Sequence, residues 1–342
     1  MDWSRGPTVG RGSFATVSAA ISNLTGHIFA VKSTQLSSSN SLQNEQRILS
    51  NLTHPRIIGY IGHDTTVENH KFLYNLFLEF LPYGNLNDET LRHGGTMKDS
   101  LIALYTRQIL DGLDHIHSIG IAHCDIKGQN ILLGENGAKI ADFGCAKWVS
   151  YPPPPENVIS GTPTFMAPEV AGGEEQGFPA DIWALGCTII EMATGGSPWS
   201  SHHRHYRHPC SILYRIAFSG ESPIIPDFLS GKAKDFLGRC LRRDPKERWT
   251  ARELLKHPFV EESNYAEREN EGLNSKSPMS TLNQSIWNSV EDVSEVPRPS
   301  SGFSQGDRIR QLTSFSGKPN WSREENWVTI RDYNYYKTHQ LN

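Results

Sequence analysis

The chain has 342 residues, with 33 Lys and Arg against 37 Asp and Glu, so its formal net charge is −4. This near balance offers no basic footprint for nucleic acid, and we expect no nucleic-acid partner. No stretch approaches the ~20 apolar residues of a membrane span, so we expect no membrane association. The five cysteines include no CxxC pair, which favours a reducing compartment over a disulfide framework.

The part of the chain up to about residue 80 is predicted to be mainly β-structure. Glycine-punctuated strand patterns run from Gly10 to about Val31, with a turn at 23–26, and two more strand-like runs lie within 56–80. Their β-branched and aromatic residues are typical of strands. Between them, apolar residues on one side predict a helix over 41–52.

Helical patterns dominate after that point. Apolar residues recur every three or four positions over 101–116 and over 181–192, which is the spacing of a buried helical face. Further helices are expected around residues 212, 233 and 253. A small β-rich part therefore precedes a larger helical part, and we expect two lobes.

The composition changes again near Pro258. Over 261–342 the apolar share, counted with Gly and without Tyr, falls to about 27%, and Ser, Asn and Pro are abundant. Such a segment is typical of disorder. The rest of the chain reaches about 47%, inside the ~45–50% range of globular domains. An apolar cluster around Trp327 can bind a partner, fold back or be inert, and the sequence leaves all three open.

A glycine-rich segment lies near the start of the chain. Its residues are Val9, Gly10, Arg11, Gly12, Ser13, Phe14, Ala15, Thr16 and Val17. Glycines let the backbone approach a phosphate, whose oxygens accept hydrogen bonds from backbone N–H groups. A tight turn between two strands would use the same glycines. Lys32 at the end of the next strand can then reach phosphates, and Glu45 on the following helix can pair with it.

Three further motifs follow in order: His123–Asn130 (HCDIKGQN), Asp142–Gly144 (DFG) and Ala167–Glu169 (APE). Their order and spacing are jointly improbable by chance, and with the glycine-rich segment they match the signature set of protein kinases. The sequence resembles this family over about residues 4–260. The resemblance implies an α+β, bilobal kinase fold, with a small β-rich N-lobe, a larger α-helical C-lobe and a polar C-terminal tail.

The resemblance also sets expected boundaries. The kinase domain is expected at 3–259, with the N-lobe at about 3–81 and the C-lobe at about 82–259. Residues 260–342 are expected to form a largely disordered tail, which can carry a binding site for a regulator.

The family pattern assigns the chemistry of phosphoryl transfer to four residues. Asp125 is expected to meet the incoming hydroxyl, and Lys127 to steady the transferred phosphoryl group. Asn130 and Asp142 supply the hard oxygen ligands that Mg²⁺ prefers. The implied cofactors are therefore ATP and Mg²⁺.

The same pattern places the nucleotide. Lys32 is expected to hold the α- and β-phosphates and to be held in turn by Glu45. The residues expected around the adenine are Val17, Ala30, Leu78, Glu79, Leu81 and Leu132.

The type of kinase follows from Lys127 after Asp125 and from Gly161–Glu169 (GTPTFMAPE), which resemble Ser/Thr kinases. The wider runs are similar to plant mitogen-activated protein (MAP) kinase kinase kinases of the MEKK-like group. This resemblance implies phosphorylation of Ser or Thr in a MAP kinase kinase. It also implies stress or hormone signalling, in the cytoplasm with the nucleus as a second compartment.

Two departures from the family pattern affect the expected regulation. Ala15 replaces the third glycine of the glycine-rich loop, which predicts a less free loop. Cys124 stands where most kinases have an Arg that pairs with a phosphorylated residue of the activation segment. We therefore predict that activity depends less on that phosphorylation. Prolines at 152–155 predict an extended stretch, and histidines within 202–208 a solvated insertion rather than a metal site.

Two alternatives to an active MAP kinase kinase kinase stay open. One is a pseudokinase scaffold that binds nucleotide without transferring phosphate, and the other is a Ser/Thr kinase of another signalling pathway. The complete set of catalytic residues favours an active enzyme, because a pseudokinase generally lacks at least one of them.

Overall fold

The structure is a computed structural model that describes residues 1–12, 15–149, 159–199, 209–261 and 328–330. The chain divides into two units, and every described residue belongs to the unit formed by 1–267 and 327–342. The proline run at 152–155, the histidines at 202–208 and nearly all of the expected tail lie outside the described residues, as do Ser13 and Phe14.

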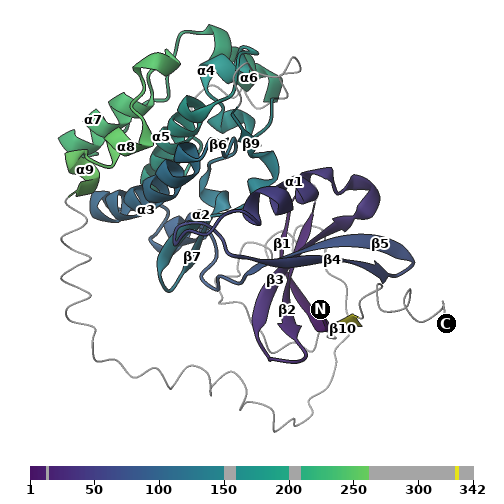
Figure 1. The fold of residues 1–342 in the computed structure, drawn as a ribbon. Coiled ribbons are helices and arrows are strands. Elements are labelled where there is room, and N and C mark those ends of the chain that lie inside the picture. The colour runs from purple at the N-terminus through teal and green to yellow at the C-terminus, as the bar shows by residue number, and fades with distance from the viewer. Residues whose placement is uncertain (13–14, 150–158, 200–208, 262–327, 331–342) are drawn as a thin grey trace, which may run out of the picture. The chain divides into compact units, whose positions relative to one another are not determined.

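The N-terminal part forms an antiparallel sheet (Figure 1). Its strands are β1 (Trp3–Arg11), β2 (Thr16–Ser22), β3 (Ile28–Gln35), β4 (Tyr60–Glu68) and β5 (Lys71–Glu79). They lie in the order β1-β2-β3-β5-β4, and a short strand β10 (Val328–Ile330) pairs with the outer edge of β1. The first strand begins at Trp3, earlier than the expected start near Gly10, and β10 falls inside the span expected to be disordered.

The two faces of this sheet bury different groups because side chains alternate along a strand. On one face, Trp3, Phe29 and Phe77 form a buried cluster with ring centroids 5.3–6.1 Å apart in edge-to-face geometry. Each such pair contributes about 0.5–1.5 kcal/mol beyond its buried area. In β3, Val31 belongs to this cluster, whereas its neighbour Ala30 belongs to the main core.

One helix accompanies the sheet. Helix α1 (Asn40–Leu49) buries Leu42, Ile48 and Leu49, as the sequence pattern predicts. Glu45 is also fully buried on this helix. A buried carboxylate needs a partner, and its partner defines the site described below.

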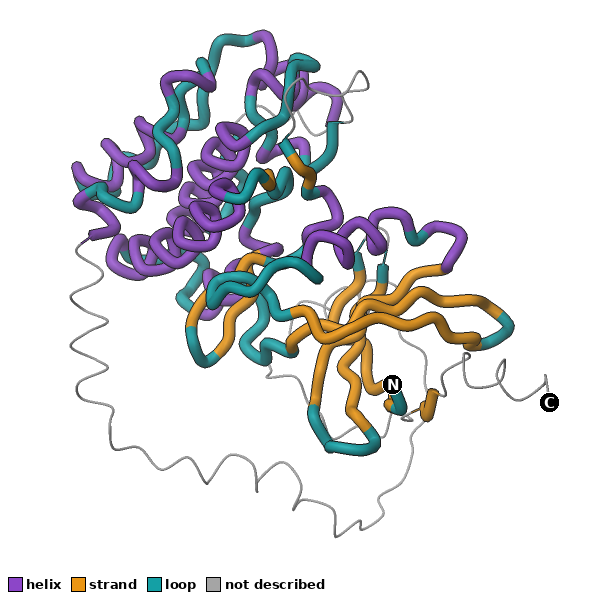
Figure 2. The backbone as a smooth tube through the Cα atoms, viewed as in Figure 1, coloured by secondary structure: helices purple, strands orange, loops and turns teal. Residues whose placement is uncertain are grey.

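The second part is mainly helical (Figure 2). Its helices are α2 (Leu86–Arg92), α3 (Asp99–Ser118), α4 (Pro168–Ala171), α5 (Phe178–Thr194), α6 (Pro209–Phe218), α7 (Gly231–Cys240), α8 (Ala251–Leu254) and α9 (Pro258–Glu261). Short antiparallel pairs join β6 (Ile121–Ala122) to β9 (Lys147–Trp148) and β7 (Ile131–Gly134) to β8 (Gly137–Ile140). The β-rich and helical lobes expected from the sequence are thus confirmed.

Helix α5 is the central helix of this lobe. Almost every residue from Ala180 to Ala193 is buried, including Asp181 and Trp183. A helix that is apolar all round must be enclosed by other elements, so its first turn is a rigid place from which to hold a loop. Among the described helices, none is long and apolar enough to cross a membrane.

Candidate active site

An ion-paired group joins the sheet, α1 and the DFG segment. Lys32 Nζ of β3 lies 2.6 Å from Glu45 Oε2 of α1 and 2.8 Å from Asp142 Oδ1. The second oxygen of Glu45 accepts the backbone N–H of Phe143 at 3.1 Å. Glu45 therefore places the lysine and the DFG backbone in one arrangement.

The two carboxylates of this group favour the charged form of Lys32, whereas burial, with the negative charge of Asp142, raises the pKa of Glu45. Burial disfavours the charged form of Lys32, but Glu45 and Asp142 outweigh it and raise its pKa above the ordinary value. Burial likewise opposes ionisation of Asp142, but the attraction of Lys32 and its hydrogen bond hold the pKa of Asp142 below the usual range. Lys32 is thus a fixed cation and Asp142 a fixed anion at neutral pH.

The loop after β6 gathers donors around one carboxylate. Asp125 Oδ2 accepts from Lys127 Nζ at 2.9 Å and from Asn130 Nδ2 at 3.0 Å. Its Oδ1 accepts from both the backbone N–H (2.9 Å) and Oγ1 (2.7 Å) of Thr162. Lys127 Nζ also donates to Thr162 Oγ1 at 2.7 Å. The carboxylate, the cation and the hydroxyl form one hydrogen-bonded group.

Helix α5 holds this loop in place through Asp181 in its first turn. Asp181 accepts the backbone N–H groups of His123 and Cys124, both at 2.8 Å, and a bond from the His117 ring at 2.9 Å. Burial works against the charged form of Asp181, but these donors hold its pKa below the ordinary value. Cys124 takes a positive φ of 66°, a strained backbone conformation for a residue with a side chain. We attribute its persistence to the two backbone bonds to Asp181.

The loop after β6 (His123–Asn130), which we call the catalytic loop after the family pattern, also touches the DFG segment directly. The rings of His123 and Phe143 meet edge to face at 4.8 Å, and both side chains are fully buried. The backbone of Asp142 has a φ of 62°, so the chain turns sharply between the buried Phe143 and Asp142, whose side chain is about half exposed. This turn directs the Asp142 carboxylate toward Lys32 while Phe143 stays in the core.

Of the residues expected around the adenine, Val17, Ala30, Leu78 and Glu79 lie in the sheet, Leu132 lies in β7, and Leu81 follows β5. In the described part of the glycine-rich loop, Gly12 N–H donates to Ala15 O at 2.9 Å and so closes the turn between β1 and β2. Val17 lies opposite Lys32 in the strand register. The apolar residues expected around the adenine are buried or half-buried: Val17, Ala30, Leu78, Leu81 and Leu132.

Some polar residues of the site carried no signal in the sequence. The Glu79 carboxylate binds Lys139 Nζ at 2.8 Å and accepts Gly59 N–H at 3.0 Å, a side-chain role beyond the expected backbone contact with adenine. Glu191 on α5 accepts the N–H of Gly128 within the catalytic loop at 3.2 Å. Isolated polar residues of this kind belong to no motif, so spacing alone could not find them.

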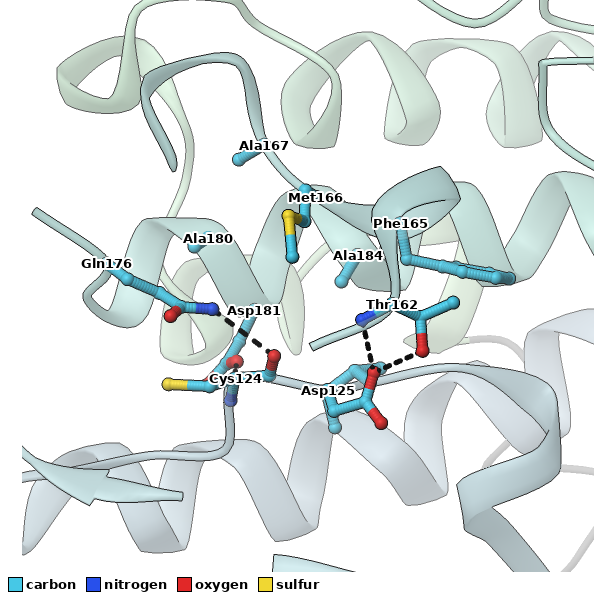
Figure 3. Close-up of a pocket in the computed structure, with 11 residues that line it drawn as sticks. Cys124, Asp125, Thr162, Phe165, Met166, Ala167, Gln176, Ala180, Asp181 and Ala184 are labelled. Carbon is cyan, nitrogen blue, oxygen red and sulfur yellow. Dashed lines mark hydrogen bonds between the residues drawn. The ribbon is translucent and has the colours of Figure 1, made fainter. Parts of the chain in front are cut away.

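A small pocket lies between the catalytic loop, the segment Thr162–Ala167 and the start of α5 (Figure 3). Its lining includes Asp125 and Phe165, and Met166 extends into the space between them and α5. This segment continues into α4, where Glu169 meets Arg248 through two bonds of 2.7 and 2.6 Å. The segment that lines the pocket is therefore followed by a helix that a buried ion pair holds in place.

The comparisons with known proteins agree with this geometry. The protein kinase domain model matches residues 3–260, and the chain belongs to the protein kinase family. Mitogen-activated protein kinase kinase kinase 18 of Arabidopsis thaliana is 46% identical over 97% of this chain and 99% of its own length. The corresponding kinases 17 and 20 of that plant are 50% and 40% identical, over 85% and 97% of this chain and 78% and 100% of their own lengths.

Within the protein kinases, the chain therefore belongs to the serine/threonine kinases of the MAP kinase kinase kinase type. The bilobal kinase fold expected from the motifs is confirmed, and membership of the family implies that the chain uses ATP and acts on protein substrates.

Proposed function

We propose that this chain transfers the γ-phosphate of ATP to a Ser or Thr of a MAP kinase kinase. The observation that carries the proposal is the group around Asp125, where a carboxylate, the Lys127 ammonium and the Thr162 hydroxyl lie within 2.7–2.9 Å of one another. The names of the plant relatives supply the substrate class. We take the kinase domain as 3–259, divided near residue 81, with 260–342 as an appendage.

Asp125 is the residue that meets the substrate hydroxyl. Each of its oxygens already accepts two hydrogen bonds, which fills the acceptor capacity of a carboxylate. The incoming hydroxyl therefore replaces one donor. Lys127 is the donor best able to leave, because its flexible ammonium can turn toward the phosphoryl oxygens while Asn130 and Thr162 keep the carboxylate in place.

The reaction is a direct transfer. The hydroxyl oxygen bonds to the γ-phosphorus, the bond from that phosphorus to the β–γ bridging oxygen breaks, and Asp125 takes the hydroxyl proton. ADP leaves with the electrons of the broken bond. Lys127 neutralises charge on the moving phosphoryl group, and Lys32 holds the α- and β-phosphates through its position beside Glu45.

The oxygens present fit Mg²⁺. Asp142 is a fixed anion beside Lys32, and Asn130 turns its Nδ2 toward Asp125, which leaves its amide oxygen to face a cation. Asp142 and Asn130 would hold Mg²⁺, which would offset the negative charge of the phosphates. Among the described residues, no cluster of three or more His, Cys, Asp or Glu could hold a metal alone, so these residues would bind the ion together with the phosphates.

The nucleotide site follows the same reasoning. We assign the adenine to the apolar walls formed by Val17, Ala30 and Leu132, with Leu78 at the back. The backbone of Glu79–Leu81 faces the adenine edge, and the turn of the glycine-rich loop covers the phosphates. A tail-binding regulator remains part of the proposal. So do signalling in stress and a cytoplasmic site, the latter supported by the odd number of cysteines and the absence of a CxxC pair.

Two alternatives are testable against this function. A nucleotide-binding pseudokinase would lack a catalytic group, whereas this chain has Lys32 paired with Glu45 and Asp142, and Asp125 paired with Lys127. A kinase of another pathway would share the site and differ only in its protein substrate. The sequence-similar relatives favour the MAP kinase kinase as substrate.

Radiolabel transfer from ATP to a panel of MAP kinase kinases, with unrelated Ser/Thr substrates beside them, tests the proposal. The wild type is expected to label a MAP kinase kinase on Ser or Thr, and Asp125→Asn to lose at least about 1,000-fold in kcat. Equal labelling by both proteins would overturn the catalytic assignment. Labelling of unrelated substrates alone would select the other pathway.

A further inference from the structure

Gln176 occupies a central place in the segment between α4 and α5. Its side chain is buried, with 3% exposed. The amide oxygen Oε1 accepts the backbone N–H of Ser160 at 3.3 Å, while Nε2 donates to Ser160 O at 2.9 Å and to Cys124 O at 3.2 Å. Both donors and the acceptor of one amide are thus used between two separate backbone segments.

These two segments are the ones that meet at the catalytic carboxylate. Gly161 has a φ of +116°, and a Cβ at this position would collide with the carbonyl oxygen of Cys124. The next residue, Thr162, directs its N–H and its hydroxyl to Asp125 Oδ1. The position of Ser160 therefore decides whether Thr162 reaches Asp125. Figure 3 shows Gln176 near Cys124 and Thr162 near Asp125.

The link made by Gln176 carries no net charge. Burial raises the pKa of the Cys124 thiol far above its ordinary value, so the thiol is neutral, and Cys124 accepts from Gln176 through its backbone carbonyl. Within the described residues 159–162, the cation in contact is Lys127, which reaches Thr162. Ser160 is held by an amide and not by an ion pair.

We propose that Gln176 is a positioning residue, which fixes Ser160–Thr162 against the catalytic loop so that Thr162 contacts Asp125 without a phosphate group in the link. Gln176 acts on Asp125 indirectly, through the backbone of Ser160 and Cys124. The proposal rests on the assigned role of Asp125. It predicts that loss of the amide slows phosphoryl transfer and leaves ATP binding intact.

The test compares Gln176→Met, which keeps the size of the side chain and removes its hydrogen bonds, with Gln108→Met. Gln108 is also a buried glutamine and accepts the backbone N–H of Ala138 at 2.7 Å, away from the activation segment. Both variants are expected to lower the melting temperature, because each leaves backbone groups unpaired. Only Gln176→Met is expected to lower kcat, by about tenfold or more, with the KM for ATP within about twofold.

Hydrogen exchange gives a readout that does not depend on turnover. In Gln176→Met, the backbone amides of Ser160 and Thr162 are expected to exchange faster, while those of Gln108→Met in the same peptide match the wild type. Phosphatase treatment of the wild type is expected to leave both kcat and this protection unchanged. If Gln176→Met does not fold, Gln176→Glu, which keeps the bond from Ser160 N–H and loses both donors, is expected to show the same loss of kcat.

Two results would overturn the proposal: a kcat for Gln176→Met equal to that of Gln108→Met, or unchanged exchange at 160–162. Loss of wild-type protection after phosphatase treatment would show that a phosphate holds the segment, and would also overturn it. A wild type that transfers no phosphate contradicts the proposed function instead. In that case the exchange experiment alone decides on the role of Gln176.

Discussion

The ion pair between Glu169 and Arg248 offers a quantitative test of how the large lobe is held together. The guanidinium binds both carboxylate oxygens, at 2.7 and 2.6 Å, and also donates to three backbone carbonyls. It lies 5.2 Å from the ring centroid of Trp183. The side chain of Arg248 is 0% exposed and that of Glu169 is 7% exposed, so water cannot replace a missing partner.

Glu169→Ala leaves the Arg248 cation buried, with backbone carbonyls and the Trp183 ring as its remaining partners. Removing one partner of a buried pair costs about 3–5 kcal/mol, because the remaining charge stays desolvated. For a domain of this size each kcal/mol lowers the melting temperature by about 2–4 °C. We therefore expect a fall of about 6–20 °C in the full chain. We also expect a higher KM for the protein substrate, since α4 directly follows the segment that lines the pocket.

The matched control is the exposed pair of Arg252 and Asp114, whose atoms lie 3.3 Å apart and whose side chains are 67% and 28% exposed. Arg252→Ala is expected to cost about 0–1 kcal/mol, because solvent screens this pair. Both variants are followed by circular dichroism during thermal and urea unfolding. If Glu169→Ala is no less stable than Arg252→Ala, burial does not set the strength of the first pair and the reasoning fails.

Three further predictions follow from the site and the sheet. Because the pKa of Asp142 is lowered and that of Lys32 is raised, their ion pair stabilises the fold fully above the ordinary Asp pKa of 3.8 and weakens as pH falls through the Asp142 pKa. The difference in unfolding free energy between the wild type and Asp142→Asn, measured without nucleotide, should therefore stay constant from about pH 6 to 8 and shrink below about pH 4. Ser160→Ala should keep kcat within about threefold, whereas Thr162→Ala should lower kcat at least about tenfold, because the Thr162 hydroxyl donates to the Asp125 carboxylate. Complete loss of activity in Ser160→Ala, restored by an acidic residue at that position, would contradict this. Deletion of 328–342 should speed hydrogen exchange in the paired part of β1 and leave kcat unchanged; unchanged exchange would argue against the β1–β10 pairing in solution.

The sequence could predict the features that depend on local spacing. Apolar periodicity located α3 and α5, because a helix repeats its buried face every three or four residues. Motifs singled out Lys32, Asp125 and Asp142, and in the structure each of them takes part in an ion pair. Gln176 and Glu191 could not be found in this way, because their partners lie between 16 and 104 residues away in sequence and form no motif with them.

The start of β1 also depends on contacts that are distant in sequence and that local patterns do not predict. The expected strand began near Gly10, where glycines and β-branched residues give a local signal. In the structure the strand begins at Trp3, which is held by partners more than sixty residues away: Trp3 Nε1 donates to Asp64 Oδ2 at 3.0 Å. No window of sequence contains both groups, so this anchor could only be seen in three dimensions.

That anchor also explains how the glycine-rich loop is supported. In the five-strand order β1-β2-β3-β5-β4, strands β1 and β4 stand at opposite ends, yet Trp3 reaches Asp64, and Arg5 binds Glu68 through two bonds of 3.1 and 2.8 Å. The sheet must therefore curl until the side chains of its end strands meet. Strand β1 begins where its side chains meet β4 and then continues into the glycine-rich loop. The polar bonds of Trp3 and Arg5 to β4 therefore fix the strand that carries the loop.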